Sequence, residues 1–337
     1  MKKNVLYLGN NLSSTKTNVS YMKGLSVALE REGFNVLCKS AYLNKGRRIL
    51  DMVLSTFKYG PKRDYALIDT YSTQNFYYAL VVSQVCRFIR LPYIPILHGG
   101  NLPQRLTRNP KLCKLLFQPA KALVSPSRYL ESVFKTHGYT NVVYIPNSLQ
   151  IENYLFQSKP IAVIKLLWVR SFSTIYNPKL AIDILKKLLD TGHKAELCMV
   201  GPDTDGSISE VKAYADTLGL FVTFTGKLTK QKWTTLAQDY NVFINTTNFD
   251  NMPVSVIEAM ALGLPVISTN VGGMPFLIDH EQDGLLVPPN DADAFVEAIN
   301  RLKDQPELVV KLTKQARAKV ETYDWEVVKA KWISVLE

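Results

Sequence analysis

Residues 242–268 have the sequence VFINTTNFDNMPVSVIEAMALGLPVIS. The apolar run at 242–245 has the length of a buried strand, residues 253–262 have the length of a helix, and a second apolar run follows at 265–268. This order predicts two parallel strands joined by a crossover helix. Ligands of such sheets bind at loops that follow the carboxyl ends of strands, so the polar loop 246–252 is a candidate site.

The same alternation extends over both halves of the chain and predicts twelve strands, at 4–8, 35–39, 65–69, 93–97, 122–124, 142–145, 165–169, 196–200, 221–224, 242–245, 265–268 and 285–287. Helices are predicted at 19–32, 178–191, 209–218, 229–239, 253–262 and 291–303, with two more near the C-terminus. This pattern predicts an α/β protein with two Rossmann-like, doubly wound parallel sheets whose ligand-binding edges face a central cleft.

The chain of 337 residues is long for one domain. Residues 148–160 follow neither periodicity cleanly, which indicates a linker. We therefore predict an N-terminal domain at 1–150 on the acceptor side, a linker at 151–160 and a second domain at 161–320. A C-terminal helix at 321–337 is expected to cross back to the first domain.

The loop 246–252 and the helix after it carry two acids, Asp250 and Glu258. Pro253 suits the first helical position, and the free N–H groups of a helix start attract phosphate. Glu258 can then accept hydrogen bonds from ribose hydroxyls, and Asp250 from hydroxyls of a sugar beyond the phosphates. The alternative is that Ser255-x-x-Glu258 is only a capping box and that Asp250 is a solvated loop acid.

The run from Asp250 to Gly273, with PVSVIEAMALGLPVISTNVGG, resembles the acidic-x7-acidic signature of family 4 of the retaining glycosyltransferases, which have the GT-B fold. A weaker similarity covers nearly the whole chain. The resemblance implies that Glu258 binds the donor ribose and Asp250 the donor sugar. It also implies that the backbone of Asn251, Met252, Pro253 and Val254 binds sugar and phosphates. The family usually has Glu where this chain has the shorter Asp250.

Arg170 follows the first predicted strand of the second half. A guanidinium offers a planar fork for diphosphate oxygens, whereas the alternative is an ion pair with a nearby carboxylate. In the family this Arg pairs with a Lys about five residues later, where this chain has Ile175-Tyr176-Asn177. Lys179 on the next helix is the candidate replacement.

His98 precedes Gly99-Gly100 at the end of a first-half strand, where an imidazole faces the ligand edge. The family has a His in this region, so His98, Arg170 and Asp250 are the catalytic candidates. Further donor-binding positions are implied by resemblance to family loops: Gly9, Asn10, Gly201, Gly226, Lys227, Gly272 and Gly273. The acid that commonly follows the last two is replaced by Phe276.

No cluster of His, Cys and carboxylates has metal-ligand spacing. We therefore expect no metal and no cofactor, with the nucleotide sugar as a substrate. Arg170 and the helix start after Pro253 would stabilise the leaving diphosphate electrostatically. Retention of configuration is implied by the resemblance, and a same-face mechanism with a short-lived oxocarbenium-like species is favoured.

The net charge of +11 is unevenly distributed, because residues 1–150 hold 21 Lys plus Arg against 6 Asp plus Glu. This excess indicates an anionic partner. Residues 45–58 form a basic stretch with Ile49, Met52, Val53 and Phe57 at helical spacing, and a second runs from Arg105 to Lys121. Both can bind an anionic membrane, or their apolar faces can be core with a solvated rim of cations.

No signal peptide or membrane-spanning segment is predicted, and four scattered cysteines suggest free thiols in a reducing compartment. The expected location is cytoplasmic, with peripheral binding at the inner membrane face.

The sequence therefore predicts a hexosyltransferase with a UDP-sugar donor, or GDP-mannose next, and a glycan or lipid-linked acceptor. The alternatives are a nucleotide-sugar epimerase of the same architecture, an inactive sugar-binding protein and a nucleic-acid-binding protein. The last is disfavoured because the cations lack a nucleic-acid-binding motif.

Overall fold

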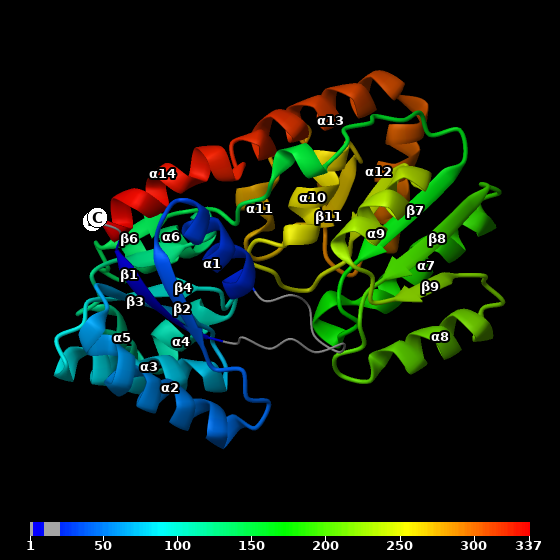
Figure 1. Cartoon of the computed structure of the whole chain (residues 1–337). Coiled ribbons are helices and arrows are strands. Elements are labelled where there is room, and N and C mark those ends of the chain that lie inside the picture. The colour runs from blue at the N-terminus through cyan, green and yellow to red at the C-terminus, as the bar shows by residue number, and fades with distance from the viewer. Residues whose placement is uncertain (1–2, 10–20) are drawn as a thin grey trace. The chain divides into compact units, whose positions relative to one another are not determined.

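The computed structural model describes residues 3–9 and 21–337, which form two compact units. Unit 1 contains the chain up to Asn147 together with Trp325–Glu337, and unit 2 contains Ser148–Asp324. Each unit has a six-stranded parallel sheet covered by helices on both faces (Figure 1). The predicted fold of two Rossmann-like parallel-sheet domains is confirmed.

The sheet of unit 1 has the strand order β2-β1-β3-β4-β5-β6. Its strands are β1 (Asn4–Leu8), β2 (Asn35–Lys39), β3 (Tyr65–Thr70), β4 (Tyr93–Leu97), β5 (Leu123–Ser125) and β6 (Val142–Tyr144). Its helices are α1 (Tyr21–Arg31), α2 (Lys45–Tyr59), α3 (Gln74–Phe88), α4 (Leu102–Arg108), α5 (Pro110–Phe117), α6 (Arg128–Thr136) and α14 (Trp325–Leu336), with a 3-10 helix at Gly60–Lys62.

Alternate residues of the strands in unit 1 point to opposite faces and build two cores. Leu6 and Leu8 of β1 pack under α2 and α3, whereas Val5 and Tyr7 pack under α1 and α14. The C-terminal helix α14 is held by fully buried Trp332. Loss of such a side chain costs about 3–5 kcal/mol, so α14 is an integral layer of unit 1.

The sheet of unit 2 has the order β12-β11-β10-β7-β8-β9. Its strands are β7 (Ile164–Val169), β8 (Ala195–Val200), β9 (Thr223–Gly226), β10 (Val242–Asn245), β11 (Val266–Thr269) and β12 (Leu285–Val287). Its helices are α7 (Pro178–Asp190), α8 (Ser207–Thr217), α9 (Lys230–Leu236), α10 (Val254–Leu262), α11 (Met274–Leu277), α12 (Ala292–Asp304) and α13 (Pro306–Glu321). Short 3-10 helices lie at Ile151–Asn153, Thr174–Tyr176 and Ala237–Asp239.

The predicted apolar face of residues 45–58 is partly wrong. Met52 is buried in the core, but Phe57 is exposed, together with Leu54 and Leu50 about one and two turns before it. The inward face is completed by Thr56, whose hydroxyl donates to the carbonyl of Met52. Helix α2 therefore presents apolar side chains on its outer face as well as its inner face.

The structure shifts the limits of two further predicted elements. The strand predicted at 221–224 is observed two residues later, and the helix predicted from Pro253 begins at Val254, with Pro253 as its N-cap. Asn10 and the predicted start of the helix at 19 lie outside the described residues. Across residues 3–9 and 21–337, no helix has the length and apolar character needed to cross a membrane.

Candidate functional site

The strand order of unit 2 brings Arg170 and Asp250 together. The chain runs from β7 through β8 to β9 and then returns to place β10 on the other side of β7. The loops after β7 and β10 therefore diverge at the carboxyl edge, where ligands of doubly wound sheets bind. Arg170 follows β7, Asp250 lies in the loop after β10, and the guanidinium Nη2 donates to Asp250 Oδ2.

The Arg170 guanidinium is largely buried and held on two sides. Its side chain is 13% exposed and that of Asp250 14%, so water screens this ion pair only partly. The guanidinium carbon also lies 3.9 Å from the ring centre of Tyr176, in cation–π geometry. Its Nε is buried and has no hydrogen-bond partner among residues 3–9 and 21–337, and such a donor is a candidate ligand contact.

The loop after β10 packs against the loop after β11. The Gly273 N–H donates to the Asp250 carbonyl at 2.8 Å, and a Cβ at position 273 would lie 1.9 Å from the Asn251 carbonyl oxygen. Only glycine fits at this close approach. Gly272 lies against the same Asp250 carbonyl, and the Asn251 N–H donates to Asp250 Oδ1 at 2.8 Å. These contacts fix the Asp250 carboxylate beside Arg170.

Glu258 lies one turn into α10 and is buried. Its Oε1 accepts from the Tyr154 hydroxyl at 2.6 Å and forms an ion pair with Lys230 at 2.8 Å. Burial and the neighbouring carboxylate raise the pKa of Tyr154, so its hydroxyl remains a donor. Both contacts use Oε1, which leaves Oε2 for a ligand hydroxyl.

The capping-box alternative is wrong. Ser255 lies inside α10 rather than at its N-cap, and its buried hydroxyl has no hydrogen-bond partner in the part of the chain that the structure describes. Glu258 bonds to side chains, not to the N-cap backbone. The alternative of a solvated Asp250 is likewise contradicted by its buried pair with Arg170.

The remaining donor candidates of unit 2 lie at the same sheet edge, with one exception. Gly201 follows β8 and its N–H donates to the carbonyl of Gly226 at the end of β9, and Lys227 comes next with an exposed side chain. Met252 is buried, and Val254 is exposed at the helix start. Lys179 instead pairs with Glu210 of α8 at 3.3 Å on the exposed surface, and its role in place of the family lysine stays a prediction.

In unit 1, three neighbouring strands bring His98 together with a buried acid. His98 follows β4, Asp69 lies near the end of β3, and Tyr7 lies on β1. Asp69 Oδ1 is 2.9 Å from His98 Nε2 and accepts from the Tyr7 hydroxyl, also at 2.9 Å. An ionised carboxylate only accepts, so Nε2 carries the hydrogen in this pair and Nδ1 remains for other contacts.

Aromatic rings fix the orientation of this imidazole. Tyr71 stacks on His98 at 5.3 Å, and Tyr21 approaches edge-on at 4.9 Å. Burial followed by the Asp69 charge raises the pKa of both tyrosines. A Cβ at Gly9 would lie 2.2 Å from Asp69 Oδ2, so glycine at this position makes room for the carboxylate. Gly9 was predicted to contact the donor. Within the described residues it contacts Asp69, where the missing side chain leaves room for the carboxylate.

Sequence reasoning missed four side chains that surround the predicted ones. They are Tyr154, Lys230, Tyr176 and Asp69, and each contacts Glu258, Arg170 or His98. Tyr154 lies in the segment predicted as a linker, where no sequence pattern indicated a ligand site. Asp69 could have been found from the sequence, since an acid that ends an apolar strand is costly to bury without a partner. Among the described residues, no group of three or more His, Cys, Asp or Glu side chains is arranged to hold a metal ion.

Comparison with known proteins assigns the family of this site. Residues 155–319, which include Arg170, Asp250 and Glu258, match the family profile described as glycosyl transferases group 1. This segment of unit 2, just under half of the chain, is thus similar to the group 1 glycosyl transferases. The matched segment contains every donor-site candidate of unit 2.

Curated relatives match over part of their length. The sulfoquinovosyl transferase SQD2 of Arabidopsis thaliana is 29% identical over 154 residues, 45% of this chain and 29% of the relative. The UDP-Gal:alpha-D-GlcNAc-diphosphoundecaprenol alpha-1,3-galactosyltransferase of Escherichia coli is 35% identical over 80 residues, 24% of this chain and 20% of the relative. The chain thus spans less than a third of the length of either relative.

Solved structures share the fold along the whole chain. Anabaena Alr3699/HepE in complex with UDP-glucose superposes with a TM-score of 0.77 at 17% identity, covering 99% of both chains. Sucrose-phosphate synthase from Thermosynechococcus elongatus gives a TM-score of 0.79 at 17% identity, covering 99% of this chain and 98% of that one. The fold is therefore GT-B.

Proposed function

We propose that this protein is a retaining, metal-independent glycosyltransferase that moves a hexose-type sugar from a UDP-sugar to a glycan or lipid-linked acceptor. The observation that carries the proposal is the Arg170–Asp250 ion pair at the switch point of unit 2, one loop away from buried Glu258. A nucleotide sugar has an anionic diphosphate between two sets of hydroxyls. The site offers a guanidinium paired with one carboxylate, and a second, buried carboxylate in the helix that follows the same loop.

The ion pair between Arg170 and Asp250 suits exchange with this ligand. Removing one partner of a buried pair is costly because it leaves the other charge unpaired. A nucleotide sugar replaces both partners at once, since its diphosphate pairs with Arg170 and its sugar hydroxyls donate to Asp250. The unsatisfied Arg170 Nε and Ser255 hydroxyl supply further donors for the phosphates.

Glu258 supplies the contact for the nucleoside. Its free Oε2 accepts a ribose hydroxyl, while Tyr154 and Lys230 hold Oε1 and fix the carboxylate. The amide groups of the first turn of α10 attract the phosphates, because Pro253 caps the helix without a side-chain bond. UDP is the favoured nucleotide because HepE structures contain UDP, UDP-glucose, and UDP with glucose.

Catalysis rests on charge stabilisation in this proposal. Arg170 and the α10 N-terminus face negative charge that develops on the leaving diphosphate, as preorganised donors do in other enzymes. The favoured route is attack from the face that the diphosphate leaves, through a short-lived oxocarbenium-like species, and His98 of unit 1 is the further catalytic candidate. Lys179 takes no part while it pairs with Glu210.

A lipid-linked acceptor is favoured by the surface of unit 1. The exposed face of α2 carries Leu50, Leu54 and Phe57, and Phe88 of α3, 80% exposed, packs edge-on to Phe57 with ring centres 6.3 Å apart. Lys45, Arg47 and Lys58 of α2 are exposed as well. Apolar side chains rimmed by cations suit the headgroup layer of an anionic membrane. The E. coli relative named above has an acceptor linked to diphosphoundecaprenol by its name.

The test is a panel of nucleotides and nucleotide sugars in a thermal-shift assay, followed by product analysis with the ligand that binds. UDP and a UDP-sugar should raise the melting temperature without added metal, and EDTA should leave the shift unchanged. Transfer with retained anomeric configuration should follow when acceptor is added. Isomerisation of the donor without an acceptor would indicate an epimerase, and donor binding without turnover an inactive sugar-binding protein.

A further inference from the structure

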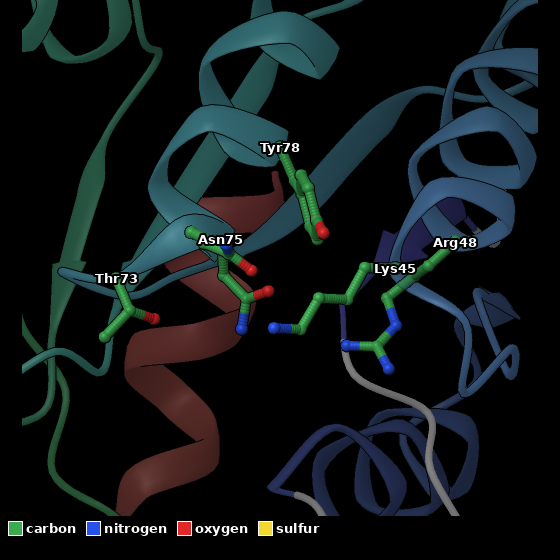
Figure 2. Close-up of a pocket in the computed structure, with 6 residues that line it drawn as sticks. Lys45, Arg48, Thr73, Asn75 and Tyr78 are labelled. Atoms are coloured by element: carbon green, nitrogen blue, oxygen red, sulfur yellow. The ribbon is translucent and has the colours of Figure 1, made fainter.

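Unit 1 has an open cavity of about 300 Å³ where α2 and α3 begin. It is lined by Lys45, Arg48, Thr73, Gln74, Asn75 and Tyr78. Figure 2 shows Lys45 extending from the start of α2 toward the side chain of Asn75 on α3. The lining contains two cations and four neutral side chains that can donate hydrogen bonds, and no carboxylate.

The two cations of the cavity are held differently. Arg48 is 8% exposed, and its Nε and Nη2 donate to the carbonyls of Tyr42 and Leu43 at 2.9 and 3.2 Å. The loop before α2 thus fixes the guanidinium at the cavity wall. Lys45 is exposed and forms no ion pair within the described ranges 3–9 and 21–337. Like charges at positions i and i+3 of a helix repel each other, and an anion between them relieves that repulsion.

The cavity is next to the exposed apolar surface of the same two helices. Helices α2 and α3 pack side by side, and Leu50, Leu54 and Phe57 lie one to three turns beyond Lys45 on α2. A ligand with an anionic head and an apolar tail matches this arrangement. A soluble anion would need the cationic cavity alone.

We infer that this cavity binds the phosphate or diphosphate group that joins the acceptor to its lipid, with Lys45 and Arg48 as its cationic contacts. The inference rests on the proposed function and specifies the acceptor class for that enzyme. Thr73, Asn75 and Tyr78 donate to the remaining oxygens. The apolar face of α2 and α3 lies against the membrane that carries the lipid.

The first experiment titrates the full chain with inorganic pyrophosphate by calorimetry in the presence of saturating UDP, which occupies the donor site. Wild type should retain a pyrophosphate site, and Lys45→Ala should weaken it about tenfold through loss of a charge-assisted hydrogen bond. Asn75→Asp should weaken it further by placing a carboxylate in the cavity. An acid at a helix start is favourable, so this variant should fold.

The matched control is Lys58→Ala, which removes the same charge from the last turn of α2. It should change pyrophosphate affinity less than twofold. Equal weakening by Lys45→Ala and Lys58→Ala would show a general charge effect and overturn the inference, as would unchanged binding in Asn75→Asp. UDP affinity should be the same in all variants, so failure of the donor site is seen separately.

A second arm identifies the source of the anion. Phosphatidylcholine vesicles that contain a polyprenyl diphosphate should bind wild type more tightly than vesicles of equal charge that contain phosphatidylglycerol. Lys45→Ala should abolish this difference. If wild type shows no preference while pyrophosphate still binds in solution, the lipid-linked acceptor is wrong and the cavity binds a soluble phosphate ester.

Discussion

The carboxyl edges of the two sheets carry different arrangements of charge, although both sheets are parallel and doubly wound. In unit 2 the edge holds carboxylates paired with cations, Asp250 with Arg170 and Glu258 with Lys230. In unit 1 the buried acid Asp69 pairs with an imidazole and a phenol. Two cations of unit 1, Lys45 and Arg48, lie instead on helix α2 at the cavity that they line.

Under the proposed function, the two edges bind different ligands. The paired charges of unit 2 exchange partners with a ligand that has both an anion and hydroxyl donors. Unit 1 has an oriented imidazole and a separate cationic cavity, which suit a sugar contact and an acceptor phosphate. Because both units share the doubly wound topology, the fold alone does not distinguish them; loop side chains do.

Among the changes at the two sheet edges, replacing Arg170 should lower kcat the most. Arg170→Ala removes the cation that faces the leaving diphosphate, so we expect kcat to fall about a thousandfold, within the range for loss of one preorganised donor. Arg170→Lys should recover only part of it, because an ammonium lacks the planar fork. Single-turnover kinetics with UDP-glucose measure this effect, and a loss under tenfold would contradict the assignment.

Replacing Glu258 should affect binding more than chemistry. Glu258→Ala should lower kcat/KM about a hundredfold, mainly through KM, because the hydrogen bond from a ribose hydroxyl to a charged acceptor is lost. Tyr154→Phe is the graded control, since it keeps the carboxylate and removes only one contact to Oε1. Calorimetry with UDP checks both, and turnover unchanged by Glu258→Ala would remove the basis of the proposed function.

The sequence predicted the fold well because strand length and helix spacing are local properties. All twelve predicted strands are present, and Arg170, His98, Asp250 and Glu258 all lie where the sequence placed them, after strands or at a helix start. The strand order was not predictable from these patterns. It is the order that places β10 beside β7 and pairs Arg170 with Asp250.

The partners of the predicted residues were harder to predict because they come from distant positions in the sequence. Tyr154 reaches Glu258 across 104 residues, and Asp69 reaches His98 across 29. The outer face of α2 was also assigned wrongly in part, since Met52 and Phe57 were expected on one face and lie on opposite ones. Assignment to glycosyltransferase family 4, beyond the group 1 family, stays a prediction.

A smaller effect is expected from the unit 1 edge. His98→Ala should lower kcat about tenfold, the value of one hydrogen bond to the reacting sugar, and leave UDP affinity unchanged. Asp69→Asn keeps the size of the side chain and tests the orienting contact, with a loss smaller than that of His98→Ala. Paired UDP-binding and turnover measurements separate the units, and weaker UDP binding in His98→Ala would show that the division of roles is wrong.

The smallest effect should come from the exposed aromatic side chains, and here the two units supply a matched pair. Phe88 of unit 1 is 80% exposed and Phe221 of unit 2 is 90% exposed. If only unit 1 binds the membrane, Phe88→Ser should lower partition into anionic vesicles about threefold, a fraction of the free energy of burying a Phe side chain. Phe221→Ser should leave partition unchanged.

Because neither ring is buried, neither change should lower the melting temperature, so sedimentation with vesicles reports binding directly. Equal losses in both variants would mean that exposed aromatic area, and not the α2–α3 surface with its cations, determines membrane binding.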